Sequence, residues 1–172
     1  ERAFPPDPDI YFFDKAGAFI WEPSRNHFSQ VSDISTVNIS LLKGMDEEIE
    51  KVRLNTKAFL EGSLANNVLI WGARGMGKST LIKSVVKAAS SQSKFLKIIE
   101  VARDDIGQVD KLLKLIKNIN KKFIIFCDDI SFDDNETSYK SLKSVLDGGL
   151  IGGMQNVLVY ATSNRRHLLS RK

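Results

Sequence analysis

Eight consecutive residues of this chain have the types and spacing of a phosphate-binding loop. They are Gly72-Ala73-Arg74-Gly75-Met76-Gly77-Lys78-Ser79. The pattern G-x-x-x-x-G-K-[ST], between a strand and a helix, forms a P-loop (Walker A). Its glycines let the main chain wrap closely around an anion, and the N–H groups of the loop and of the following helix N-terminus point at that anion.

Each position of this loop has an expected task. Lys78 places its charge on the β- and γ-phosphates of a nucleotide, and the Ser79 hydroxyl ligates Mg²⁺. We expect ATP or ADP to contact the whole segment from Gly72 to Thr80. For Arg74, phosphate contact and a solvated side chain remain equally open.

Two acidic residues follow an apolar run further along the chain. The run Phe123–Cys127 indicates a buried strand, and Asp128 and Asp129 come at its carboxyl end, where open α/β sheets bind their ligands. We expect Asp128 to hold Mg²⁺ through water, as a Walker B acid, and Asp129 to polarise the attacking water. Because aspartate is one methylene shorter than glutamate, Asp129 reaches less far, and a role in ordering the following turn stays open.

Helical and strand patterns alternate around these residues. Apolar stripes predict a helix from Asp46 that closes at Gly62, a second from about Lys78, and others along 109–116 and 139–146. Short apolar runs predict strands at Val68–Trp71, Leu96–Val101, Phe123–Cys127 and Val157–Tyr160. Strands that alternate with helices imply a parallel sheet covered on both faces.

The first forty residues have a different composition from the rest. They are rich in aromatic residues and hold all 4 prolines of the chain. Ile10–Phe13 and Ala18–Glu22 flank Asp14-Lys15-Ala16-Gly17, which predicts a β-hairpin with a glycine-containing turn. We therefore divide the chain into an N-terminal hairpin arm, residues 1–40, and a core, residues 41–172. Packing on the core and docking to a partner or neighbouring subunit are both open for the arm.

Composition restricts the class of protein. The 172 residues suffice for one domain, and 42% hydrophobic with 27% charged residues is typical of a globular chain. No apolar run approaches the roughly 18 residues of a membrane span. Cys127, the single cysteine, has no internal disulfide partner, which fits a cytoplasmic protein and predicts a structural thiol. His27 and His167 stand apart from other metal ligands, so no zinc site is expected.

Five lysines form a basic strip in the second half of the chain, at Lys111, Lys114, Lys117, Lys121 and Lys122. The net charge of +4 permits nucleic acid as a partner but does not argue for it. No aromatic residue is interleaved with these lysines, as binding to single strands requires. A solvated helix face explains the strip, and the sequence leaves nucleic acid as a possible but unsupported partner.

These motifs, in this order, resemble the AAA+ ATPases. Val157–Asn164 resembles the sensor 1 strand, which implies that Asn164 reaches toward the γ-phosphate and the attacking water. Leu41–Asp46 resembles the segment that touches adenine. The stretches NTKAFLEG, NNVLIWGARGMGKST, FCDDISF, YKSLKSVLDGG and NVLVYATSNRRHL resemble a bacterial family of predicted AAA+ ATPases catalogued as domain of unknown function 815. The resemblance spans about Ser40 to His167.

The resemblance implies a fold. This fold is a three-layer α/β sandwich with a mostly parallel sheet, whose strands follow the order 5-1-4-3-2. The sheet has five strands, or four if the fifth lies beyond the chain end. The hairpin arm is expected to pack against it. The lid subdomain of the superfamily is expected to be absent, because the chain stops at Lys172. Residues 147–156 contain no arginine at the usual place of the arginine finger, and Arg165 and Arg166 are either substitutes or solvated.

The expected function is ATP binding and slow hydrolysis to ADP and phosphate, which drives the remodelling of an unknown client. A homo-oligomer of the full-length protein is expected, and no membrane partner. Two alternatives stay open: a nucleotide-gated binding module with little hydrolysis, and a helicase-loader-like ATPase associated with DNA.

Overall fold

The computed structural model describes residues 11–25, 27–31, 42, 44–72, 77–130, 140, 142–144 and 155–164. Several predictions lie outside these ranges: half of the helix predicted along 139–146, four loop residues, and both candidate finger arginines. These residues are Ala73, Arg74, Gly75, Met76, Arg165 and Arg166.

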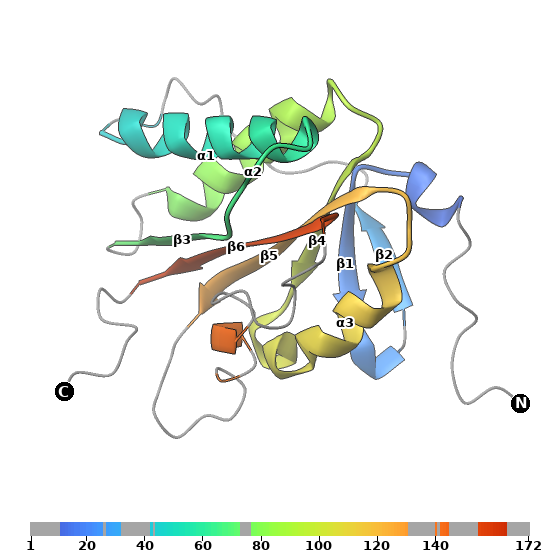
Figure 1. The fold of residues 1–172 in the computed structure, drawn as a ribbon. Helices are drawn as coiled ribbons and strands as arrows, with labels where there is room; N and C mark the ends of the chain where they lie inside the picture. Colours follow the sequence, from blue (N-terminus) through green and yellow to red (C-terminus); the bar gives the residue numbers. More distant parts are fainter. Residues whose placement is uncertain are drawn as a thin grey trace, which may run out of the picture.

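Six strands form one sheet in the order β2-β1-β4-β5-β6-β3 (Figure 1). Their bounds are β1 Ala18–Glu22, β2 His27–Val31, β3 Val68–Trp71, β4 Leu96–Val101, β5 Lys122–Ile130 and β6 Val157–Ser163. β1 and β2 are antiparallel, and every other neighbouring pair is parallel. Without the hairpin, the order β3-β6-β5-β4 is the 1-4-3-2 part of the expected sheet. A fifth strand of the expected order lies outside the described residues.

Helices cover both faces of this sheet, which gives three layers (Figure 1). On one face lie α1, Asp46–Leu60, and α2, Lys78–Ser90, and on the other lies α3, Val109–Ile116. Three 3-10 helices complete the described elements: η1 Phe12–Asp14, η2 Pro23–Arg25 and η4 Arg103–Gln108. No helix in these ranges is long and apolar enough to cross a bilayer.

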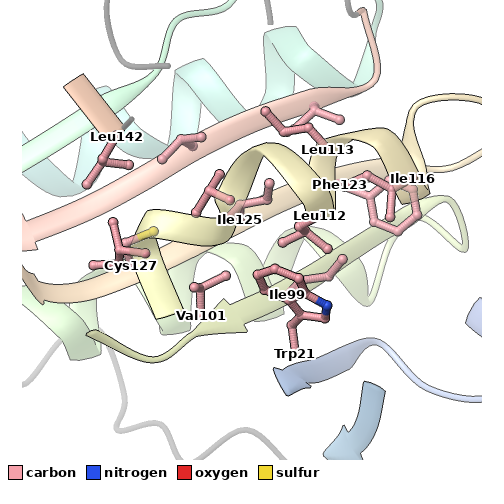
Figure 2. Close-up of a cluster of buried hydrophobic side chains, with 14 of the residues drawn as sticks. Trp21, Ile99, Val101, Leu112, Leu113, Ile116, Phe123, Ile125, Cys127 and Leu142 are labelled. Atoms are coloured by element: carbon pink, nitrogen blue, oxygen red, sulfur yellow. The ribbon is translucent and has the colours of Figure 1, made fainter. Parts of the chain in front are cut away.

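The central strand β5 is buried on both faces. Phe123, Ile125 and Cys127 belong to the hydrophobic cluster beneath α3, and Ile124 and Phe126 belong to the cluster beneath α1 and α2. Figure 2 shows the first cluster, with the sulfur of Cys127 among aliphatic side chains. Burial raises the pKa of the Cys127 thiol to about 12, so this thiol stays protonated at neutral pH. The prediction of a structural cysteine in a buried strand is confirmed.

The predicted position of the N-terminal hairpin is wrong. Phe12–Asp14 forms the 3-10 helix η1, and β1 pairs instead with β2, across a turn at Pro23–Arg25. The cause is the packing of Phe13, whose ring lies 5.0 Å from that of Phe19 and 5.0 Å from that of Phe123. A 3-10 turn places this ring in the core. Since β1 also pairs with β4, the hairpin extends the main sheet instead of packing on it as an arm.

A buried hydrogen-bond cluster ties α1 to the sheet and supports a stability prediction. The Tyr160 hydroxyl, on β6, lies 2.7 Å from Thr56 Oγ1 and accepts a hydrogen bond from Asn55 Nδ2 at 3.1 Å. We expect Tyr160→Phe to lower the free energy of unfolding by about 1–2 kcal/mol, because Thr56 and Asn55 on α1 each lose one of their hydrogen-bond partners. Urea unfolding measures the difference, with Tyr11→Phe at an exposed position as the matched control. Equal losses in the two variants would contradict a specific role for the Tyr160 hydroxyl.

Candidate functional site

A cavity of about 440 Å³ lies at the carboxyl ends of the strands β5 and β6 and at the start of α2. It brings together residues from three distant stretches of the chain: Gly77, Lys78, Ser79, Thr80, Asp128, Asp129, Thr162 and Asn164. Seven of these eight were candidates from sequence, and Gly72 follows the end of β3 beside them. The structure thus places the described P-loop residues, the acidic pair and the sensor residue around one space.

The loop reaches this cavity through a left-handed glycine. Gly77 has φ +85° and precedes the first residue of α2, Lys78. The left-handed backbone angle of Gly77 strains any other residue, and a Cβ there would lie 2.9 Å from Leu42 Cδ2, so the Leu42 side chain would also have to shift. Leu42 belongs to the segment expected to touch adenine, and its side chain lies against Gly77. The first N–H groups of α2 are available at the cavity, as at any helix N-terminus.

The ammonium group of Lys78 is held at the wall of the cavity. The side chain is 7% exposed, and its Nζ donates to the carbonyl oxygen of Gly72 at 2.7 Å and to Asn164 Oδ1 at 3.0 Å. A buried cation is costly unless oxygen atoms surround it, and these acceptors meet that need. The charge of Lys78 is thereby fixed at a site lined by helix N–H donors, an arrangement that suits an anion.

A bulge near the end of β5 allows two successive acids to line the same cavity. In a regular strand, neighbouring side chains point to opposite faces. Here the pairing of β5 with β6 shifts register between Cys127 and Ile130, and Asp129 adopts φ +56°. Bulges redirect side chains next to functional sites, and a non-glycine residue with positive φ is uncommon. The sequence predicted a strand ending before Asp128, whereas the strand continues to Ile130 through this irregularity.

Thr162, on β6, connects the two acids and was not a candidate from sequence. Its Oγ1 donates to Asp128 Oδ1 at 2.6 Å and accepts a hydrogen bond from the backbone N–H of Asp129 at 2.8 Å. Thr162 is 1% exposed. A hydroxyl near the end of an otherwise apolar strand was the available signal in the sequence.

Arg103, at the start of η4, is a second residue that sequence reasoning missed. Its Nη2 donates to Asp129 Oδ2 at 2.5 Å, and its Nε and Nη2 donate to the Asp129 carbonyl oxygen at 3.0 and 2.6 Å. The other carboxylate oxygen of Asp129 accepts a hydrogen bond from Asn164 Nδ2 at 2.5 Å. A continuous chain of contacts therefore runs from Lys78 through Asn164 and Asp129 to Arg103. No motif marked Arg103, because only the fold brings η4 to the end of β5.

Comparisons with known proteins agree with this architecture. The sequence model of the family described as Protein of unknown function (DUF815) matches residues 14–172. No curated protein matches the chain. The structure of Aeropyrum pernix Orc1 in complex with DNA superposes with a TM-score of 0.59 at 18% identity, over 76% of this chain and 42% of that one.

Two further solved structures are similar in the same region. AMPPCP-bound DnaA from Aquifex aeolicus gives a TM-score of 0.51 at 18% identity, over 74% of this chain and 42% of that one. An arginine-to-alanine variant of Thermotoga maritima RuvB gives 0.53 at 21% identity, over 77% and 43%. The chain spans less than half the length of these proteins, and at such identities the likeness concerns the fold. The chain belongs to the family of unknown function DUF815, and its fold is that of the core of an AAA+ P-loop ATPase.

Proposed function

We propose that this chain binds Mg·ATP and hydrolyses it slowly to ADP and phosphate. The observation that carries the proposal is the meeting of Lys78, Asp128 and Asn164 around one cavity at the N-terminus of α2. The residues present fit a nucleotide phosphate chain, because a fixed ammonium, helix N–H donors and a left-handed glycine surround the space. AMPPCP, an ATP analogue, is bound in the DnaA structure of the same fold, which supports the same ligand class here.

Ser79 and Asp128 supply the oxygen ligands that Mg²⁺ prefers. When bound, Mg²⁺ neutralises charge that develops on the phosphate oxygens. Thr162 donates to Asp128 Oδ1 and so fixes the direction of this carboxylate without occupying its second oxygen. Asp128 is therefore the metal acid of the proposal, and Asp129 is left for the attacking water.

In the proposed reaction, each polar residue of the cavity acts on a different group. The N–H groups of the loop and of α2, together with Lys78, hold the phosphates. Asp129 orients the water that attacks the γ-phosphorus, and Asn164 contacts the γ-phosphate. Phosphoryl transfer depends mainly on positioning and on charge stabilisation, which are the tasks that these groups can perform.

The oligomeric state and the client of the full-length protein are also part of the proposal. We propose that the full-length protein forms a homo-oligomer in the bacterial cytoplasm and uses hydrolysis to remodel a client. The fold supports an ATPase motor or switch, and the family description names no substrate.

A nucleotide-gated binding module is the second candidate function, and one observation favours it. Both carboxylate oxygens of Asp129 accept hydrogen bonds from protein donors, Arg103 and Asn164. In this arrangement the two protein donors compete with the attacking water for the oxygens of Asp129. A chain that keeps this arrangement with nucleotide bound would bind ATP and hydrolyse it rarely.

The contact between Arg103 and Asp129 gives a prediction that tests the hydrolytic part. We expect slow steady-state phosphate release from the native chain, and an increase of up to about fivefold in Arg103→Ala. The fivefold limit follows from the interaction free energy of the Arg103–Asp129 pair, which is about 1 kcal/mol or less for a half-exposed ion pair. Arg53→Ala removes an arginine from an exposed pair on α1 and should leave the rate unchanged. A lower rate in Arg103→Ala would show that Arg103 orients Asp129 for catalysis, and does not keep Asp129 from the attacking water.

A further inference from the structure

The cavity at the start of α2 is called the phosphate cavity below; a second and larger hollow lies at the opposite, amino ends of the strands. Its volume is about 800 Å³, and it is formed by the segments that precede β4, β5 and β6, together with the end of α1. We call this hollow the basal groove; its lining residues used below are Phe95, Lys117, Asn118, Asn120, Lys121 and Lys122. It shares no residue with the phosphate cavity and is therefore a separate surface.

The charge of the basal groove is positive. Lys117, Lys121 and Lys122 line it, and none of the described residues that line it is acidic. Asp14 forms an ion pair with Lys121 at 2.6 Å from outside the lining, and Lys122 Nζ donates to the carbonyl oxygen of Gln155 at 3.3 Å. After the pair with Asp14 is subtracted, two positive charges remain uncompensated among these residues. The groove therefore suits a polyanion.

An aromatic ring lies at the same place. Phe95, in the loop before β4, is 52% exposed, and Lys121 Nζ lies 5.2 Å from its ring centroid. An exposed ring costs hydrophobic stabilisation, whereas most large apolar side chains of this chain are buried. Stacking of a planar ligand group on Phe95 would recover that burial, with cations beside it to hold phosphates.

We propose that the basal groove binds single-stranded nucleic acid, with phosphates on Lys117 and Lys122 and a base stacked on Phe95. Cations that follow a backbone, combined with an accessible aromatic face, are the two elements that single-strand binding requires. A duplex keeps its bases stacked on each other and offers none to a protein ring. Asn118 and Asn120 add amide groups that can pair with the edges of an unstacked base. An acidic peptide would use the lysines, but it would gain little from the ring.

The fold selects these residues from a wider basic strip. Lys111 and Lys114, which are exposed on α3, do not line the basal groove, whereas Lys117, Lys121 and Lys122 do. Phe95 is distant from these lysines in the sequence, and it meets them because the loops before neighbouring parallel strands lie at one edge of the sheet. No aromatic residue lies between these lysines in the sequence, but the fold brings the ring of Phe95 beside them.

Fluorescence anisotropy of a labelled oligothymidine, titrated with the full chain, tests the proposal. For single strands, log K falls with log salt concentration with a slope of about −0.7 per phosphate contact, so Lys117 and Lys122 together predict a slope of about −1.4. Lys117→Ala should make the slope shallower by about 0.7. Lys114→Ala removes the same charge from the last turn of α3, which Lys117 directly follows, but outside the groove, and it should leave the slope unchanged.

Substitutions at Phe95 separate stacking from apolar contact. Phe95→Leu keeps an apolar side chain but removes the aromatic face, and we expect it to weaken binding about fivefold or more. Phe95→Trp should retain binding. Because the ring is half exposed, both variants should keep the melting temperature of the native chain, which thermal unfolding checks.

Three results would overturn the proposal. Oligothymidine binding that Phe95→Leu leaves intact would remove the stacking contact. Binding of polyglutamate with the same affinity and salt slope would show a site for acidic polymers instead. Loss of oligothymidine binding in Lys78→Ala, or under excess ATP, would place the nucleic acid at the phosphate cavity.

Discussion

Replacing Asp129 with asparagine should lower ATP turnover by about 10²-fold or more while nucleotide binding stays intact. Asparagine keeps the size of the side chain and can accept from either Arg103 or Asn164 through its single oxygen, but it cannot take a proton from water. A positioned general base contributes roughly 10²–10⁴ in rate, which sets the expected loss. Steady-state phosphate release at saturating Mg·ATP gives the rate, and calorimetric titration gives the affinity.

Asp128→Asn is the matched control for this substitution, because the two acids are adjacent and line the same cavity. We expect Asp128→Asn to raise the Mg²⁺ concentration needed for nucleotide binding, since it removes a charge from the proposed metal site. Asp129→Asn should leave that Mg²⁺ requirement as it is. If the two variants exchanged these effects, the roles assigned to Asp128 and Asp129 would be reversed.

The parts of the fold that could be predicted from sequence are those with local patterns. The apolar stripes that begin at Asp46, Lys78 and Val109 became α1, α2 and α3. The run from Phe123 to Cys127 became the core of β5, because a strand buried on both faces must be apolar throughout. The P-loop pattern likewise includes its own strand and helix, and so the start of the phosphate cavity could be located.

The N-terminal hairpin could not be placed from its pattern. Tyr11, Phe12 and Phe13 are all aromatic, so this segment lacks the alternation of apolar and polar residues that marks a half-buried strand. The sequence therefore does not distinguish a strand from a 3-10 turn between Tyr11 and Phe13. Contacts with residues far along the chain, such as that of Phe13 with Phe123, decide between them. The pairing of β1 with β4 could not be predicted either, because it depends on β4 being an edge strand of the main sheet that is free to pair.

Part of the candidate site was hidden for a similar reason. Arg103 follows β4 and contacts Asp129 after β5, and no spacing rule joins these segments. The bulge at Asp129 was hidden as well, since an aspartate-aspartate pair after an apolar run does not reveal a positive φ. Sequence thus indicated most of the residues that line the phosphate cavity, while the fold shows what holds those residues in place.

Lys78→Ala should abolish nucleotide-induced stabilisation of the chain. At a ligand concentration about 100-fold above Kd, binding adds roughly 2.7 kcal/mol to the free energy of unfolding. For a domain of this size, that raises the melting temperature by about 5–10 °C. Lys78 Nζ is fixed by Gly72 and Asn164 at the cavity wall, so its removal takes away the charge that faces the phosphates. Each variant is compared with its own ligand-free melting temperature, because Lys78 is buried and its loss also changes the apo protein.

Lys83→Ala serves as the control, because Lys83 lies on the same helix and pairs with Glu100 outside the phosphate cavity. The decisive measurement is the melting temperature of the native chain, Lys78→Ala and Lys83→Ala, each with and without saturating Mg·ATP. The proposed site predicts a rise of about 5–10 °C in the native chain and in Lys83→Ala, and no rise in Lys78→Ala. An equal rise in all three proteins, or none in the native chain, would contradict the assignment of a nucleotide site to this cavity.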